Sequence, residues 1–87
     1  MTNPWPEFRG RRVLVTGGSQ GIGLATARAF SANGAAVWIT GTRAAAGDYA
    51  DDLSAFTYVA ADFAKADTPA AVAAEVGAVD VLINNAG

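Results

Sequence analysis

The sequence predicts an α/β fold built on a parallel sheet, and three observations predict it. Short apolar segments alternate with helical ones along the 87 residues, and a glycine-rich turn joins the first apolar segment to the first helix. The run from Val13 to Val15 is apolar throughout, as in strands buried on both faces. Such alternation implies right-handed crossovers, and the order expected for four parallel strands is 3-2-1-4. We therefore expect a Rossmann-type, doubly wound parallel sheet, incomplete because the fourth strand lies at an edge where a fifth would pair.

Apolar spacing and helix-ending residues place the elements in order. The expected strands are 13–15, 36–40, 56–61 and 79–83, and the expected helical segments are 22–33, 44–53 and 68–76. The first helix ends at Gly34 and carries one apolar face, formed by Ile22, Ala25, Ala29 and Phe30.

The other two helical segments rest on different signals. The segment 44–53 is expected to carry its aspartates on the solvent side: Asp48, Asp51 and Asp52. The segment 68–76 has clear end signals, because Thr68 suits the N-cap, Pro69 suits the first helical position and Gly77 follows the end.

The turn after the first strand, from Thr16 to Gly23, has the composition of a pyrophosphate-binding turn. Gly17, Gly21 and Gly23 allow a tight turn, close approach of a ligand to the backbone, and close packing of helix on strand. The helix that follows offers free N–H groups and the positive end of its dipole to an anion. The sequence therefore predicts a phosphate-containing ligand at this turn.

Composition limits the other classes of function. A hydrophobic content of 52% favours a folded domain, and a net charge of -2 provides no basic field for nucleic acid or an anionic membrane. The chain has no cysteine and no histidine, so we expect no metal site and no disulfide. It shows neither a signal-peptide core nor an apolar run of bilayer length, and we expect it to be cytoplasmic.

Two motifs in this chain resemble those of one family. Thr16-Gly-Gly-Ser-Gln-Gly-Ile-Gly23 resembles the Thr-Gly-x-x-x-Gly-x-Gly signature of short-chain dehydrogenases/reductases, and Asp80-Val-Leu-Ile-Asn-Asn-Ala-Gly87 looks like the family's Asn-Asn-Ala-Gly marker after the fourth strand. The resemblance implies hydride transfer between a nicotinamide cofactor and a carbonyl or alcohol. It also implies that residues 1–87 are the amino-terminal, cofactor-binding portion of one Rossmann domain, from a longer chain.

The resemblance assigns roles to residues at three strand ends. Asp62 and Phe63 would lie beside the adenine, and Asn85 against the ribose, while Asn84 would tie neighbouring strands together. Thr16 and Ser19 could equally be turn-stabilising hydroxyls, and Asp62 could be a turn cap. The implied cofactor-binding residues at these turns are Thr16, Gly17, Ser19, Gln20, Gly21, Ile22, Gly23, Asp62, Phe63, Asn85, Ala86 and Gly87.

Cofactor choice is expected at the end of the second strand, where the sequence is Ile39-Thr-Gly-Thr-Arg43. An acidic residue there would bind the ribose hydroxyls of NAD, but this chain has none at that position. Thr42 offers a hydroxyl and Arg43 a forked, permanently charged donor, which favours NADP over NAD. This resembles NADP-dependent members such as 3-oxoacyl-carrier-protein reductases. The alternative is that Arg43 is a solvated loop charge paired with Asp48.

The chain lacks the family's catalytic pair, a tyrosine followed four residues later by a lysine. Tyr49 and Tyr58 are followed at that spacing by Leu53 and Asp62, so we interpret both tyrosines as packing residues. No catalytic residue is assigned, and the segment alone is expected to be inactive.

Three functional hypotheses follow. The first is that the full-length parent is an NADP-dependent reductase or dehydrogenase. It would act on a small carbonyl or alcohol and could form a homo-oligomer. The second is a non-catalytic binding or interaction module that pairs through its fourth strand, and the third is a truncated remnant without activity.

Overall fold

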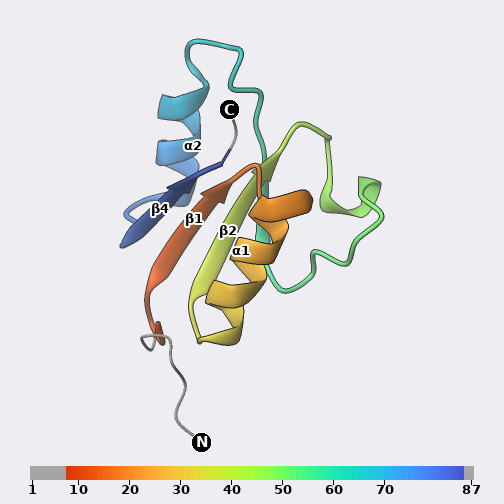
Figure 1. Cartoon of the computed structure of the whole chain (residues 1–87). Helices are drawn as coiled ribbons and strands as arrows, with labels where there is room; N and C mark the ends of the chain where they lie inside the picture. The colour runs from red at the N-terminus through yellow and green to blue at the C-terminus, as the bar shows by residue number, and fades with distance from the viewer. Residues whose placement is uncertain (1–7, 86–87) are drawn as a thin grey trace, which may run out of the picture.

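A computed structural model describes residues 8–85 and shows a four-stranded parallel sheet between helices (Figure 1). The strand order is β3-β2-β1-β4, which confirms the predicted order 3-2-1-4. The elements in chain order are β1 (Arg12–Thr16), α1 (Gly21–Ala32), β2 (Ala36–Gly41), the 3-10 helix η1 (Ala46–Asp48), β3 (Thr57–Ala60), α2 (Thr68–Val76) and β4 (Val81–Asn84).

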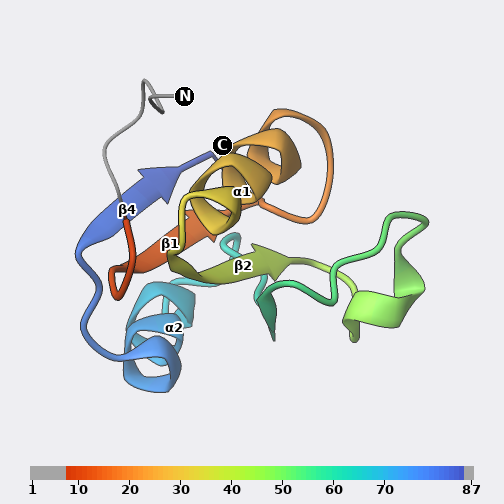
Figure 2. The ribbon, with the colours of Figure 1, turned by 90° about the horizontal axis from the view of Figure 1, so that it is seen from below.

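The helices α1 and α2 cover opposite faces of this sheet, as the view from below shows (Figure 2). Side chains alternate along β1, so Val13 and Val15 pack with Leu24 of α1, whereas Leu14 packs with Val72 of α2. Val13 and Val15 are fully buried and Leu14 is 7% exposed. The apolar run of β1 is therefore buried on both faces, as expected for a central parallel strand.

The strands are aligned so that their carboxyl ends meet at one edge. Thr16 at the end of β1 is in register with Asn84 at the end of β4, and Gly41 at the end of β2 is in register with Ala60 of β3. This edge collects the polar residues that follow each strand. Across residues 8–85, no helix has the length and hydropathy needed to cross a membrane.

The predicted apolar face of the first helix is wrong in part. Phe30 packs against the core as predicted, but the buried residues of α1 are Gly23, Leu24 and Ala27, whereas Ile22 is 79% exposed. The reason is the close approach at Gly23, which brings the start of α1 against the turn and sets the rotation of the helix. That rotation leaves Ile22 in solvent at the carboxyl edge of the sheet.

The predicted helix over 44–53 is also wrong, because only the short η1 forms there. The carboxylate of Asp48 accepts a hydrogen bond from Ala45 N at 3.1 Å, which favours a tight turn over a continuing helix. Gly47 inside the segment further weakens an α-helix. The three aspartates are exposed, as expected, and Leu53 anchors the end of the loop with 3% exposure.

The start of α2 differs by one residue from the prediction. Asp67 occupies the N-cap position, and the hydroxyl of Thr68 donates to the carbonyl oxygen of Asp62 at 2.6 Å instead of capping the helix. Gly77 ends α2 with a φ of 78°, as predicted. The strands β3 and β4 begin later than expected, since Phe56, Val79 and Asp80 belong to the connections.

Candidate cofactor-binding site

The turn between β1 and α1 depends on its glycines. Gly17 and Gly21 adopt φ angles of 67° and 61°, in the left-handed region that other residues enter only with strain. A Cβ atom at Gly23 would overlap the carbonyl oxygen of Gly17 and lie 2.5 Å from Nδ2 of Asn85. A Cβ atom at Gly21 would meet nothing within 4 Å. The turn is therefore closely packed at Gly23, whereas the space beside Gly21 is open.

The amino-terminal end of α1 is free to bind an anion. Its first intrahelical bond runs from Leu24 N to the carbonyl oxygen of Gln20 at 3.3 Å, so the preceding N–H groups lie outside the helical ladder. Among the described residues, the side chain of the N-cap Gln20 makes no capping bond. The first turn, Gly21 to Leu24, is uncharged. Partial positive charge at this end is thus left without a protein counter-charge.

The end of β4 is bonded to the end of β1 through Thr16. The Thr16 hydroxyl lies 3.1 Å from Oδ1 of Asn84 and accepts the backbone N–H of Asn85 at 3.0 Å. The side-chain amide of Asn85 donates to the carbonyl oxygen of Gly17 at 3.2 Å. Asn84 therefore ties β1 to β4, and Asn85 supports the glycine turn.

A groove of about 480 Å³ runs from this turn to the ends of β2 and β3. Gly17 lines the groove, and its N–H donates to the hydroxyl of Thr40 at 3.0 Å. The groove thus joins the glycine turn, through Gly17, to the loop that follows β2. It is lined by Gly17, Thr40, Gly41, Thr42, Ala61, Phe63 and Ala64.

The loop after β2 holds Arg43 by both its backbone and its side chain. Nη1 of Arg43 donates to the carbonyl oxygen of Asp48 at 2.8 Å, and the guanidinium carbon lies 5.2 Å from the ring centroid of Tyr49. The backbone N–H of Arg43 donates to the Tyr49 hydroxyl, and the Tyr58 hydroxyl donates to the Arg43 carbonyl oxygen. Arg43 is thus exposed but fixed in place.

The two tyrosine hydroxyls differ in acidity. Burial raises the pKa of Tyr58, and its hydrogen bond with Tyr49 raises it further. Burial also acts to raise the pKa of Tyr49, but hydrogen bonds with Ser19, Tyr58 and Arg43 outweigh it, and the net direction is down. Tyr58 is therefore the weaker acid of the two.

Comparison with known proteins decides the family. A family model described as short chain dehydrogenase matches residues 11–87. The chain belongs to the short-chain dehydrogenase family.

A dehydrogenase and a reductase are similar to this chain over most of its length. D-xylose 1-dehydrogenase of Caulobacter vibrioides is 36% identical over 88 residues, covering 95% of this chain and 36% of that protein. The 3-oxoacyl-[acyl-carrier-protein] reductase FabG of Chlamydia muridarum is 40% identical over 87 residues, covering 88% and 35%. The chain thus spans about a third of the length of these relatives.

Solved structures agree. A short chain dehydrogenase/reductase family protein has a TM-score of 0.80 and 42% identity, with 94% of this chain and 36% of that chain covered. The RhlG/NADP active-site complex of Pseudomonas aeruginosa has a TM-score of 0.81 and 32% identity, covering 99% and 37%.

The groove of this short-chain dehydrogenase brings together three of the predicted cofactor-binding residues: Gly17, Thr42 and Phe63. Sequence reasoning missed Thr40, Gly41, Ala61 and Ala64. The position of Thr40 and Gly41 at the carboxyl end of a parallel strand was the available signal, because ligands bind at that edge.

The remaining predicted residues lie around the turn and the groove. Ser19 is 4% exposed and hydrogen-bonds with Tyr49, which fits the alternative role of a turn-stabilising hydroxyl. The carboxylate of Asp62 accepts from Ala64 N at 3.0 Å, the geometry of a turn cap. Arg43 contacts the backbone of Asp48, while the Asp48 carboxylate bonds to Ala45. Gln20 and Ile22 are exposed at the start of α1, and Ala86 and Gly87 lie outside the described residues.

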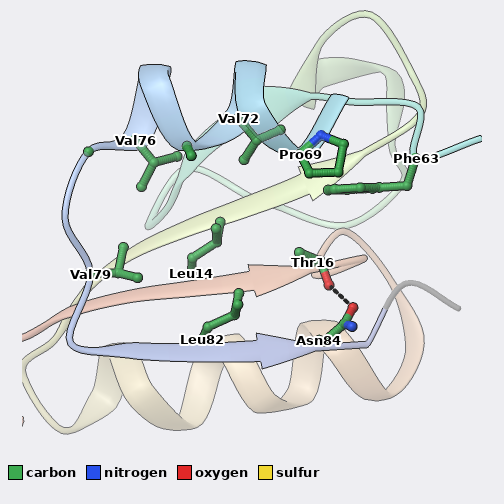
Figure 3. Close-up of a pocket in the computed structure, with 11 residues that line it drawn as sticks. Leu14, Thr16, Phe63, Pro69, Val72, Val76, Val79, Leu82 and Asn84 are labelled. Atoms are coloured by element: carbon green, nitrogen blue, oxygen red, sulfur yellow. Dashed lines mark hydrogen bonds between the residues drawn. The ribbon is translucent and has the colours of Figure 1, made fainter. Parts of the chain in front are cut away.

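A second cavity, of about 330 Å³, lies between α2 and the strands β1 and β4 (Figure 3). Its apolar walls come from Leu14, Val72 and Leu82, and Thr16 and Asn84 close one end through their hydrogen bond. Phe63 lines both this cavity and the groove, so it separates the two spaces.

Proposed function

We propose that this chain holds the adenosine and pyrophosphate portion of NADP(H) in an oxidoreductase that interconverts a carbonyl and an alcohol. The observation that carries the proposal is that the glycine turn, which leads into the uncapped start of α1, also lines through Gly17 a groove at the ends of β2 and β3. That arrangement fits an anionic group joined to a flat, partly apolar one, as a dinucleotide requires. Bound there, the cofactor supplies the hydride through its nicotinamide.

The residues around the groove fit the parts of the dinucleotide. The N–H groups at Gly21 and Ile22 would bind the pyrophosphate, and the absence of a side chain at Gly21 leaves room for it. Phe63, which is 36% exposed, would lie against the adenine, and Thr42 would face the adenosine ribose. Ile22 would lose exposed apolar surface when the cofactor covers the turn.

The preference for NADP rests on the residues after β2. Between Gly41 and Asp48 the sequence has no carboxylate that would repel a 2′-phosphate, and it has Arg43. A guanidinium can donate two parallel hydrogen bonds to a phosphate. Support also comes from RhlG, whose structure is described as an NADP complex and which is 32% identical to this chain.

Catalysis belongs to the full-length protein in this proposal. Neither Tyr49 nor Tyr58 has a lysine four residues later, so these 87 residues supply binding and not proton transfer. The small carbonyl or alcohol substrate, a cytoplasmic location, the absence of nucleic-acid or membrane partners and a homo-oligomeric parent stay predictions.

The test is cofactor binding by the full-length gene product. Dissociation constants for NADP+ and NAD+ are measured by titration calorimetry for the wild type, for Arg43→Ala and for Arg11→Ala. Arg11 pairs with Asp80 at the opposite end of β1, so its substitution removes the same charge far from the groove. We expect Arg43→Ala to weaken NADP+ binding by about 10- to 100-fold, with little change for NAD+ and for the control.

The same samples test the reaction. Carbonyl-dependent oxidation of NADPH faster than NADH supports the reductase. Binding of the cofactor without turnover of any carbonyl or alcohol would instead support the binding module. A wild type that binds NAD+ as tightly as NADP+ contradicts the proposed preference.

A further inference from the structure

We infer that Tyr49 and Tyr58 are positioning residues that hold Arg43 in place and thereby set the preference for NADP over NAD. The inference rests on the proposed function. Sequence reasoning treated both tyrosines as packing residues, but the structure gives each a direct bond to Arg43.

The two hydroxyls hold the backbone of Arg43 from both sides of the residue. Arg43 N donates to the Tyr49 hydroxyl at 3.2 Å, and the Tyr58 hydroxyl donates to Arg43 O at 2.5 Å. The two hydroxyl oxygens are 3.2 Å apart and share a hydrogen bond. The rings meet edge to face, with centroids 5.7 Å apart. These bonds fix both peptide groups that flank the Cα of Arg43.

Tyr49 also holds the side chain. The Arg43 guanidinium lies over the Tyr49 ring, and the neighbouring carbonyl oxygen of Asp48 accepts one of its N–H groups. These contacts use only part of the five donors of a guanidinium, so the others stay available to a phosphate. An arginine ordered before binding loses less conformational freedom when it binds.

The tyrosine pair is joined to the groove at the end of β2. A Cβ atom at Gly41 would overlap the Tyr49 hydroxyl and lie 2.7 Å from Oγ of Ser19 and 2.9 Å from the Tyr58 hydroxyl. Gly41 itself lines the groove. Three hydroxyls therefore converge on the strand end where cofactor choice is made, and Ser19 connects them to the glycine turn.

The protonation state of the Tyr58 hydroxyl agrees with this role. Burial and the bond to Tyr49 raise the pKa of Tyr58, so the hydroxyl that donates to the Arg43 carbonyl stays protonated to a higher pH than an ordinary tyrosine would. A pair that served packing alone would need only its rings.

The test compares three variants of the full-length protein. Tyr49→Leu removes ring and hydroxyl, Tyr49→Phe removes the hydroxyl alone, and Tyr58→Phe removes the donor to the Arg43 carbonyl. The measured quantity is the ratio of the NAD+ and NADP+ dissociation constants. We expect Tyr49→Leu to lower that ratio by about three- to tenfold and each phenylalanine variant by about two- to threefold, with the loss confined to NADP+.

A double-mutant cycle shows whether the effect passes through Arg43. In an Arg43→Ala background, Tyr49→Leu is expected to change the ratio by less than about twofold, because nothing remains to be positioned. Phe56→Leu is the matched control. Phe56 is an aromatic residue of the loop between β2 and β3, as Tyr49 is, and it packs against the core between α1 and the sheet. It is expected to lower stability and leave the ratio unchanged.

The outcomes separate this inference from the proposed function. No NADP preference in the wild type overturns both. A preference that Arg43→Ala abolishes and the tyrosine variants leave intact overturns the inference alone. Equal weakening of both cofactors by the tyrosine variants also overturns it, because that result indicates packing. If Tyr49→Leu does not fold, the two phenylalanine variants keep the rings, and their ratio of dissociation constants decides between positioning and packing.

Discussion

The backbone N–H of Gly17 donates to the hydroxyl of Thr40 at 3.0 Å. Gly17 begins the turn after β1, and Thr40 lies in β2, so this bond holds the glycine turn to the neighbouring strand. The Thr40 side chain is almost fully buried, with 1% of the residue exposed. A polar side chain at that position would be costly without its partner, which makes the pair a structural requirement of the site.

Replacing Thr40 with valine keeps the shape of the side chain and removes the acceptor. The Gly17 N–H would then lose its partner, and we expect the free energy of unfolding to fall by about 1–3 kcal/mol. NADP+ and NAD+ binding should weaken by the same factor, because the turn serves both. Chemical denaturation and cofactor titration measure the two effects. Thr40→Ser keeps the hydroxyl and is the control; a valine variant as stable as wild type contradicts the assignment.

Gly23→Ala tests the close packing of α1 on the turn. The added methyl would overlap the Gly17 carbonyl oxygen and crowd Asn85, so the backbone must shift. We expect a loss of about 1–3 kcal/mol in the free energy of unfolding and weaker binding of both cofactors.

Gly47→Ala is the matched control for that substitution. A Cβ atom at Gly47 would meet nothing within 4 Å, and its φ is not positive. The same chemical change in η1 should therefore leave stability and binding close to wild type. Equal effects at the two glycines would contradict the packing role of Gly23.

The sequence was sufficient where one local feature decides the structure. The uninterrupted apolar run of β1 required burial on both faces, and the strand order followed from the crossovers. The glycines of the turn were recognised for the same reason, since positive φ at Gly17 and Gly21 is a local property of the backbone.

The sequence was insufficient where distant contacts decide. The exposure of Ile22 depends on how closely Gly23 approaches Gly17. The helix over 44–53 is lost for two reasons: the local bond from Ala45 N to Asp48, and the bonds between Arg43 and the two tyrosines. Tyr49 and Tyr58 are nine residues apart in sequence, and neither periodicity nor propensity indicates that their hydroxyls meet. These contacts, which apolar spacing does not indicate, decide the structure in both segments.

Asp52 gives a prediction for pH dependence. Hydrogen bonds from the Ser54 hydroxyl and from Ser54 N, at 2.9 Å, lower the pKa of Asp52 from its ordinary value of 3.8, and Arg28 adds a smaller effect. A lowered carboxyl pKa stabilises the fold above the unfolded value, and the stabilisation is lost as pH falls through the folded value. Asp52→Asn should therefore be less stable than wild type near pH 7, and the difference should shrink as the pH falls below 3.8 and through the lowered pKa of Asp52. Urea unfolding across this range measures it, and a difference independent of pH contradicts the prediction.

The last prediction concerns Thr16, which bonds the ends of β1 and β4. Its hydroxyl accepts the Asn85 N–H at 3.0 Å and bonds to Asn84 Oδ1 at 3.1 Å, and the residue is 6% exposed. Thr16→Val should lower the free energy of unfolding by about 1–3 kcal/mol, because it leaves these polar groups without this partner. The local effect is sharper than the global one: amide hydrogen exchange at Asn85 should accelerate more than exchange at Val15 in the middle of the sheet. Thr16→Ser retains the hydroxyl and should keep the slow exchange at Asn85. Uniform acceleration at both amides would show that β4 opens only with the whole sheet, and that Thr16 does not secure its end.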